Sequence, residues 1–159
     1  MEPLPTPLRR RSTSKGQSLV ETAIVLPILI VFCLSFVDLA SVLFTYLQLG
    51  DGVAQATRYA VTGRQADDPD RPGMQLSREQ SVMRALRTAL PTLVINDGDV
   101  TFYNVKTHAP GIGGPNDLIN VRVIYKVPLV SPALLALVSD GTITLRVSTT
   151  MKNEPFPTT

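Results

Sequence analysis

An apolar run near the N-terminus limits what this chain can fold into more than any other feature. From Leu19 to Val37 the sequence reads LVETAIVLPILIVFCLSFV, with one charged residue, Glu21. A helix that crosses the core of a bilayer needs about 20 apolar residues. We therefore predict that this run spans a membrane once. The residues expected in the core of the span are Leu19, Ile24, Leu26, Pro27, Ile30 and Phe32.

A cleavable secretory signal is the alternative interpretation, because the run follows a basic segment. Such a signal has a short apolar core, and small residues follow at its cleavage site. The only candidate for that site is Asp38-Leu39-Ala40, where Asp38 puts a charge in the place of a small residue. The sequence favours a retained anchor. Asp38 itself is expected to be a solvated charge at the level of the headgroups.

Charge is distributed unevenly around the run. Residues 1–15 carry a net charge of +3, from Arg9, Arg10, Arg11 and Lys15 against Glu2, and the remaining residues carry a net of −1. Basic flanks stay in the cytoplasm, so we expect a cytoplasmic N-terminus and an extracytoplasmic C-terminal part. A protein that binds nucleic acid carries its basic excess on the folded domain. That class is therefore disfavoured.

Residues that could support catalysis or hold a metal are few. His108, the only histidine, lies in a segment rich in Gly and Pro, and Cys33, the only cysteine, lies inside the apolar run. One Cys and one His build neither a disulfide nor a metal cluster. Asp67, Asp68 and Asp70 are expected to be solvated in a Pro-containing linker. We predict no enzymatic activity, no metal site and no cofactor.

Glu21 is the informative charge, because a carboxylate in a membrane helix is costly and usually has a partner. Either it is shallow enough to reach headgroup water, or a cation from elsewhere pairs with it. The segment KGQSLVE, residues 15–21, resembles the processing site of type IV pilin-like precursors. In that family a membrane peptidase cuts after a glycine, and a glutamate is the fifth mature residue. The resemblance implies a cut between Gly16 and Gln17.

The longer stretch from Gly16 to Arg64 resembles the TadE-like domain of pseudopilins from tight adherence (Tad) pilus systems. It shares the Gly-Gln start, the Glu, the Leu-Pro in the span, an Asp about one span later and the residues around Arg58. The closing segment 149–156 also resembles that of such proteins. Thr22 differs from the Tyr that follows the Glu in major pilins, and the chain is longer, so a minor pilin or pseudopilin is favoured.

The resemblance implies the following location and partners. The chain would lie in the bacterial inner (cytoplasmic) membrane, be cut by a prepilin peptidase and assemble with other pilins. Cleavage would place a cationic amine on Gln17, one helical turn from Glu21. In a bundle of such helices that amine could neutralise the glutamate of the next subunit and set its register. A membrane-anchored binding module outside any pilus and an adhesin tip remain as alternatives; no small-molecule substrate is indicated.

The helix is expected to continue beyond the membrane. Apolar residues recur at steps of three and four as far as Ala60, and Gly63 is a plausible stop. The sequence thus predicts a rod over residues 17–62, although Gly50 and Gly52 weaken a helix by about 1 kcal/mol each. Pro27 is expected to favour a kink.

The remaining residues predict a small mixed domain. Ser77 and Gln80 offer a capping box before a second amphipathic helix that ends near Pro91. Apolar residues then alternate over 119–127 and 143–147, with a weaker strand at 100–106 and a short helix at 132–138. We predict an α+β, pilin-like fold with a three-stranded antiparallel sheet. Its parts are a leader (1–16), a rod (17–62), a linker (63–76) and an extracytoplasmic domain (77–159).

Overall fold

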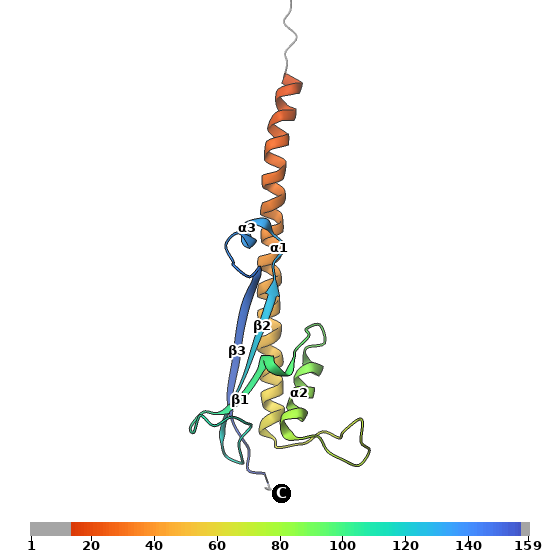
Figure 1. Cartoon of the computed structure of the whole chain (residues 1–159), viewed down its shortest axis with the longest axis vertical. Helices are drawn as coiled ribbons and strands as arrows, with labels where there is room; N and C mark the ends of the chain where they lie inside the picture. Colours follow the sequence, from red (N-terminus) through yellow and green to blue (C-terminus); the bar gives the residue numbers. More distant parts are fainter. Residues whose placement is uncertain (1–13, 157–159) are drawn as a thin grey trace, which may run out of the picture.

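The computed structural model describes residues 14–156 of the chain. It has the predicted α+β architecture: one long helix, further short helices and a three-stranded antiparallel sheet (Figure 1). The cluster Arg9–Arg11 of the predicted leader lies outside the described residues. In chain order the elements are α1 (Ser14–Val61), α2 (Arg78–Ala89), η1 (Asp97–Asp99), β1 (Val100–Asn104), β2 (Leu118–Pro128), α3 (Pro132–Leu135) and β3 (Thr142–Lys152).

Helix α1 is the axis of the molecule. Its 48 residues give a rod of roughly 70 Å at about 1.5 Å per residue. The helix is continuous through Pro27 and both internal glycines, and it begins three residues before the predicted start. It ends where Gly63 adopts φ +70°, a left-handed conformation that glycine reaches without steric cost. In Figure 1 the upper half of α1 is bare, and the domain packs around its lower half.

The two glycines within α1 differ in their surroundings. A Cβ placed on Gly50 would meet nothing within 4 Å, whereas a Cβ on Gly52 would lie 2.5 Å from Cγ of Leu90. Gly52 is buried in the contact between α1 and the end of α2. Gly52 was expected to weaken α1, but it allows the end of α2 to approach α1 closely.

Helix α2 begins at the predicted capping box. Ser77 Oγ accepts a hydrogen bond from the Gln80 amide at 3.2 Å, and Gln80 Oε1 accepts one from the Ser77 amide at 3.1 Å. Two amides at the helix start, which have no partner within the helix, are satisfied in this way. The buried face of α2 carries Val82, Met83 and Leu86, and it packs on α1.

The sheet has the order β1-β2-β3 with antiparallel neighbours. On the central strand, Val123 pairs with Val100 on one side and Val147 on the other. The alternation is confirmed at most positions: Ile119, Val121, Val123 and Val127 are buried, and Arg122 and Lys126 are exposed, whereas Asn120 is also buried. The sheet's apolar face joins the inner faces of α1 and α2 in one core, which includes Leu49, Val53, Ala56, Ala60, Val82, Leu86, Val121 and Val123.

Candidate functional site

The predicted processing segment forms the first turns of α1. Gln17 Nε2 donates a hydrogen bond to Glu21 Oε1 at 3.2 Å, so the two residues lie on the same face of the helix, one turn apart. Both side chains are exposed. A Cβ on Gly16 would meet nothing within 4 Å, and a glycine inside a helix costs about 1 kcal/mol relative to alanine. Packing within the described part of the chain does not require a glycine at this position.

The apolar run is bare. The side chains predicted for the core of the span, Leu19, Ile24, Leu26, Ile30 and Phe32, are between 50% and 72% exposed. Within the described residues, one helix, Gly16–Val61, is long and apolar enough to cross a membrane, and only 6% of its most apolar 18-residue window is buried. An apolar helix in the core of a soluble protein would be mostly covered. The arrangement is consistent with a single membrane anchor.

The structure corrects the expectation for Asp38. This residue is 6% exposed, and its Oδ2 accepts hydrogen bonds from the backbone amides of Val130 and Ser131 at 3.0 and 2.6 Å. One turn earlier, the hydroxyl oxygens of Ser35 and Ser131 lie 2.5 Å apart. Asp38 is therefore a buried acceptor rather than a solvated charge. It fastens the connection between β2 and β3 to α1.

Sequence reasoning missed this contact because its partners are more than ninety positions apart. One signal was present. Ser131 followed by Pro132 is a typical start of a helix, and such a start has amide groups in need of an acceptor. The predicted short helix at 132–138 exists as α3, Pro132–Leu135.

The far end of α1 is held by the segment that follows β3. The amide of Glu154 donates to the carbonyl of Val61 at 2.9 Å. The side-chain amide of buried Asn153 donates to the carbonyls of Ile112 and Gly114 at 3.1 and 2.7 Å. This segment closes the domain over the end of the rod.

Arg78 connects the same parts of the chain. Its guanidinium donates to the carbonyls of Gly113, at 2.5 Å, and Ala60, at 3.3 Å. It also lies over the ring of Phe156, 4.4 Å from the ring centre. Burial lowers the pKa of Arg78 below its ordinary value. Arg78 thereby joins α1, α2, the loop of residues 108–116 that contains Gly113, and the C-terminal segment.

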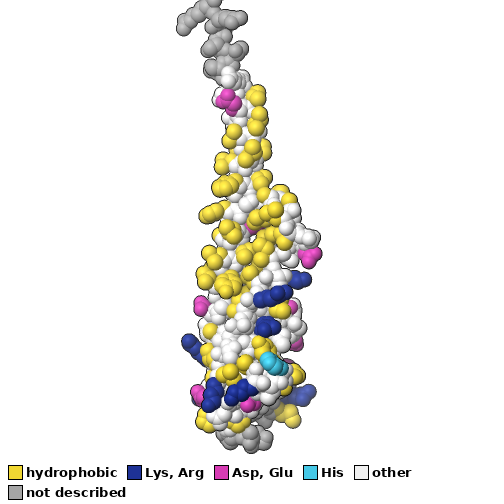
Figure 2. All heavy atoms as spheres, turned by 90° about the vertical axis from the view of Figure 1, so that its left-hand side faces the viewer, with side chains coloured by type: hydrophobic (Ala, Val, Ile, Leu, Met, Phe, Trp, Pro, Cys, Tyr) yellow, Lys and Arg dark blue, Asp and Glu magenta, His cyan; other side chains and the backbone are white. Residues whose placement is uncertain are grey.

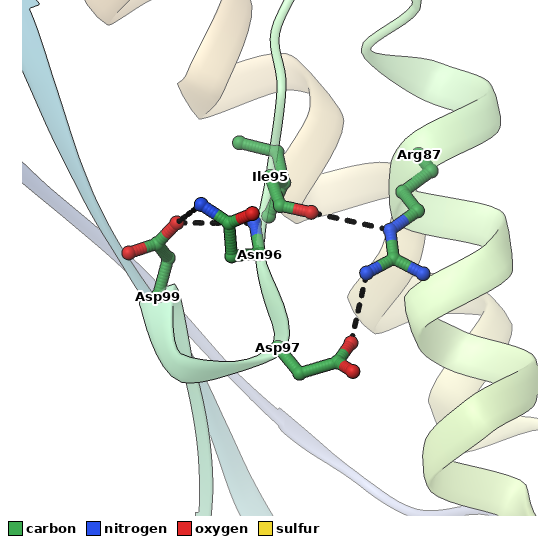
Figure 3. A network of polar contacts seen from close by, with 5 residues as sticks. All are labelled: Arg87, Ile95, Asn96, Asp97 and Asp99. Atoms are coloured by element: carbon green, nitrogen blue, oxygen red, sulfur yellow. Dashed lines mark hydrogen bonds and ion pairs between the residues drawn. The ribbon is translucent and has the colours of Figure 1, made fainter.

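A groove of about 780 Å³ runs between α2, the 68–70 loop and β1. The basic residues along it bind nearby loops. Arg84 donates to the carbonyl of Asp67 at 2.9 Å. Arg87 donates to the carbonyl of Ile95 at 3.2 Å and pairs with Asp97 at 2.8 Å, as Figure 3 shows. Among the described residues, no group of three or more His, Cys, Asp or Glu side chains is placed to hold a metal ion.

The N-terminal part of the chain matches a known protein family. Residues 16–58 match the family model described as TadE-like protein. No curated protein and no solved structure matches the chain. The matched segment begins at Gly16 and includes the bare half of α1, Asp38 and much of the buried half. Over residues 16–58 the chain is therefore similar to TadE-like proteins.

Proposed function

We propose that this chain is a membrane-anchored pseudopilin or minor pilin that supports assembly of a Tad-type adhesion pilus. One observation carries the proposal: the Gly16–Gln17 bond and Glu21 stand at the head of a bare apolar helix that matches the TadE-like family. The anchor would lie in the bacterial inner membrane with its N-terminus in the cytoplasm. The domain of α2 and the sheet would be outside, and its role would not be enzymatic.

Processing by a prepilin peptidase accounts for the glycine at position 16. The space around Gly16 is open, so neither core packing nor a turn explains why this residue is tolerated in a helix. Recognition by a peptidase supplies a reason from outside the chain. Cleavage would remove the basic leader and leave Gln17 with a free cationic amine.

That amine would give the Glu21 carboxylate a cationic partner. Among the described side chains, no Lys or Arg forms an ion pair with Glu21. Gln17 and Glu21 lie one turn apart, so the amine of one subunit could reach the carboxylate of a neighbour shifted by about one turn. Removal of one partner from such a buried pair typically costs about 3–5 kcal/mol. The pairing would set the axial register between subunits.

The first test is the mass of the protein purified from membranes with and without the prepilin peptidase. We expect a mature N-terminus at Gln17 when the peptidase is present and the full leader when it is absent. Gly16→Ile should retain the leader even in the presence of the peptidase. A leader retained by the wild type in both strains would overturn the proposal and favour the plain membrane-anchored binding module.

The second test concerns assembly. Glu21→Ala should leave membrane insertion intact but abolish crosslinking to partner pilins, and Glu21→Gln should do the same because it also lacks the charge. Glu154→Ala is the matched control, since that glutamate is exposed and its hydrogen bond to Val61 comes from the backbone amide. Crosslinking that persists in both Glu21 variants would contradict the pairing.

A further inference from the structure

We propose that the connection between β2 and β3, residues 129–141, enters the outer interface of the bilayer beside α1 and forms a second membrane contact. The occupant we assign to its exposed apolar face is lipid. This inference rests on the part of the proposed function in which α1 spans the membrane. It does not depend on pilus assembly.

This connection is called the interface loop below. The first observation is its position along α1. It is fastened at Ser35 and Asp38, and Ser35 belongs to the apolar run predicted to span the membrane. Within residues 19–37 only Val31 and Ser35 are partly covered; the others are exposed. These two lie on one helix face with Asp38, since residues three and four apart are neighbours on a helix. The interface loop therefore lies beside the last turns of the span.

The second observation is its composition. From Leu129 to Ser139 the sequence reads LVSPALLALVS and contains no charge. Val130 and Leu137 are 70% and 81% exposed, and Leu135 is also exposed. Figure 1 places α3 at the top of the domain, where the bare part of α1 begins. In Figure 2 hydrophobic side chains continue from the bare helix onto this uppermost part of the domain.

The third observation concerns the backbone. A segment in contact with the hydrocarbon region must satisfy its own polar groups, because no water is available there. Asp38 accepts from the amides of Val130 and Ser131. Further amides of the loop donate to carbonyls within it: Leu129 to Gly141, Leu135 to Ser131, Ala136 to Pro132, Leu137 to Leu134 and Val138 to Leu135. Pro132 has no amide hydrogen to satisfy.

The three observations together favour lipid over water around the interface loop. The buried carboxylate of Asp38 then has a specific purpose. It holds residues 129–139, an uncharged stretch most of whose amides are hydrogen-bonded, at the depth where the helix leaves the bilayer. The first charged residue after this stretch, Asp140, is exposed.

The test is the depth of single fluorescent labels in the full-length protein. In a Cys33→Ala background, Leu137→Cys is labelled with an environment-sensitive dye after reconstitution into vesicles of phosphatidylethanolamine and phosphatidylglycerol. Val94→Cys is the matched control, because Val94 is also apolar and exposed, at 77%. Its neighbour Thr92 contacts Gln48, ten residues beyond Asp38 along α1 or about 15 Å lower. Leu29→Cys reports the span itself.

We expect a blue-shifted emission at position 137 and its loss when brominated lipids replace ordinary ones, with no change at position 94. Quenching at position 29 alone would overturn the inference while leaving the membrane anchor intact. A blue shift at position 137 that depends on the protein-to-lipid ratio and resists brominated lipid would overturn it in favour of a second copy of the chain. Absence of quenching at position 29 would refute the anchor itself, and with it the inference.

Discussion

The carboxylate of Asp38 and the amide of Ser131, 93 positions apart in the chain, are joined by a buried hydrogen bond of 2.6 Å. This bond fixes the connection between β2 and β3 against the long helix. Ser131 is fully buried, so water cannot replace the acceptor that Asp38 provides. The contact therefore links the end of the apolar run to the connection between two strands.

Removal of the Asp38 carboxylate should destabilise the domain. Asp38→Ala leaves two amides without an acceptor, and each buried polar group left unpaired costs about 1–3 kcal/mol. Asp38→Asn should cost less, because its amide oxygen can still accept. The measurements are denaturant unfolding in detergent micelles, followed by circular dichroism, and hydrogen exchange at Val130 and Ser131. Asp51→Ala, at an exposed carboxylate of the same helix, is the control; equal stability of the two alanine variants would contradict the assignment.

The two glycines of α1 should respond to alanine in opposite directions. Gly50→Ala should stabilise the protein by about 1 kcal/mol, because the space is open and alanine favours the helix. Gly52→Ala should destabilise it by about 1–3 kcal/mol, because its Cβ would overlap the buried side chain of Leu90. Denaturant unfolding of both variants checks the prediction. A gain at both positions would show that α2 moves away at little cost.

Gly63→Ala should destabilise the end of α1 for two separable reasons. The residue has φ +70°, where a side chain costs about 1–3 kcal/mol, and its Cβ would lie 2.5 Å from the ring of Phe156. A double-mutant cycle with Phe156→Ala removes the overlap and retains the backbone strain. Gly98→Ala, where the space is open, should stay within about 0.5 kcal/mol of the wild type. Additive losses in the cycle would exclude a steric contribution.

Arg78→Lys should be costly although it keeps the charge. A lysine cannot hold both carbonyl contacts in the fixed fork of a guanidinium or stack as well on Phe156. Hydrogen bonds to charged groups contribute about 1.5–3 kcal/mol each, so we expect a loss of roughly 2 kcal/mol in the free energy of unfolding. Arg58→Lys, at an exposed position, should be nearly neutral. Similar stabilities of the two lysine variants would contradict the role of Arg78.

The ion pair between Arg87 and Asp97 should contribute little to the free energy of unfolding. Its side chains are 50% and 85% exposed, and exposed pairs are typically worth about 0.2–1 kcal/mol. Asp97→Ala should therefore cost less than Arg87→Ala, which also loses the bond to the Ile95 carbonyl. Denaturant unfolding of the two variants at low and at high salt measures the loss of stability in each. A large and salt-independent loss in Asp97→Ala would mean that the carboxylate supports the turn itself.

The elements were predictable where their signals are local. The capping box at Ser77 and Gln80 required only neighbouring residues, and the alternation along 119–127 reports burial directly. The stop at Gly63 likewise follows from the conformational freedom of one residue. These signals fix the type and order of the elements, and the structure confirms them.

The contacts that hold the elements together were not predictable in the same way. Asp38 appeared to be a headgroup-level charge because its partners lie far along the chain. Gly52 appeared to be a weak point because the approach of Leu90 follows from tertiary packing alone. The apolar composition of 129–139 was visible, but its position beside the span depends on the Asp38 contact. The role of Gly16, Gln17 and Glu21 stays a prediction, because it concerns molecules outside this chain.

The hydrogen bond from Glu154 to Val61 forms late, because Glu154 is synthesised more than ninety residues after Val61. The ribosome completes the helix long before it makes the residues that cap it. During that interval the inner face of the rod's lower half, with Leu49, Val53 and Ala56, has no sheet to cover it. The newly made protein therefore passes through a stage in which the apolar face of α1 is exposed while the domain is incomplete. A chaperone, or α1 of a second copy, can bind that face during this stage.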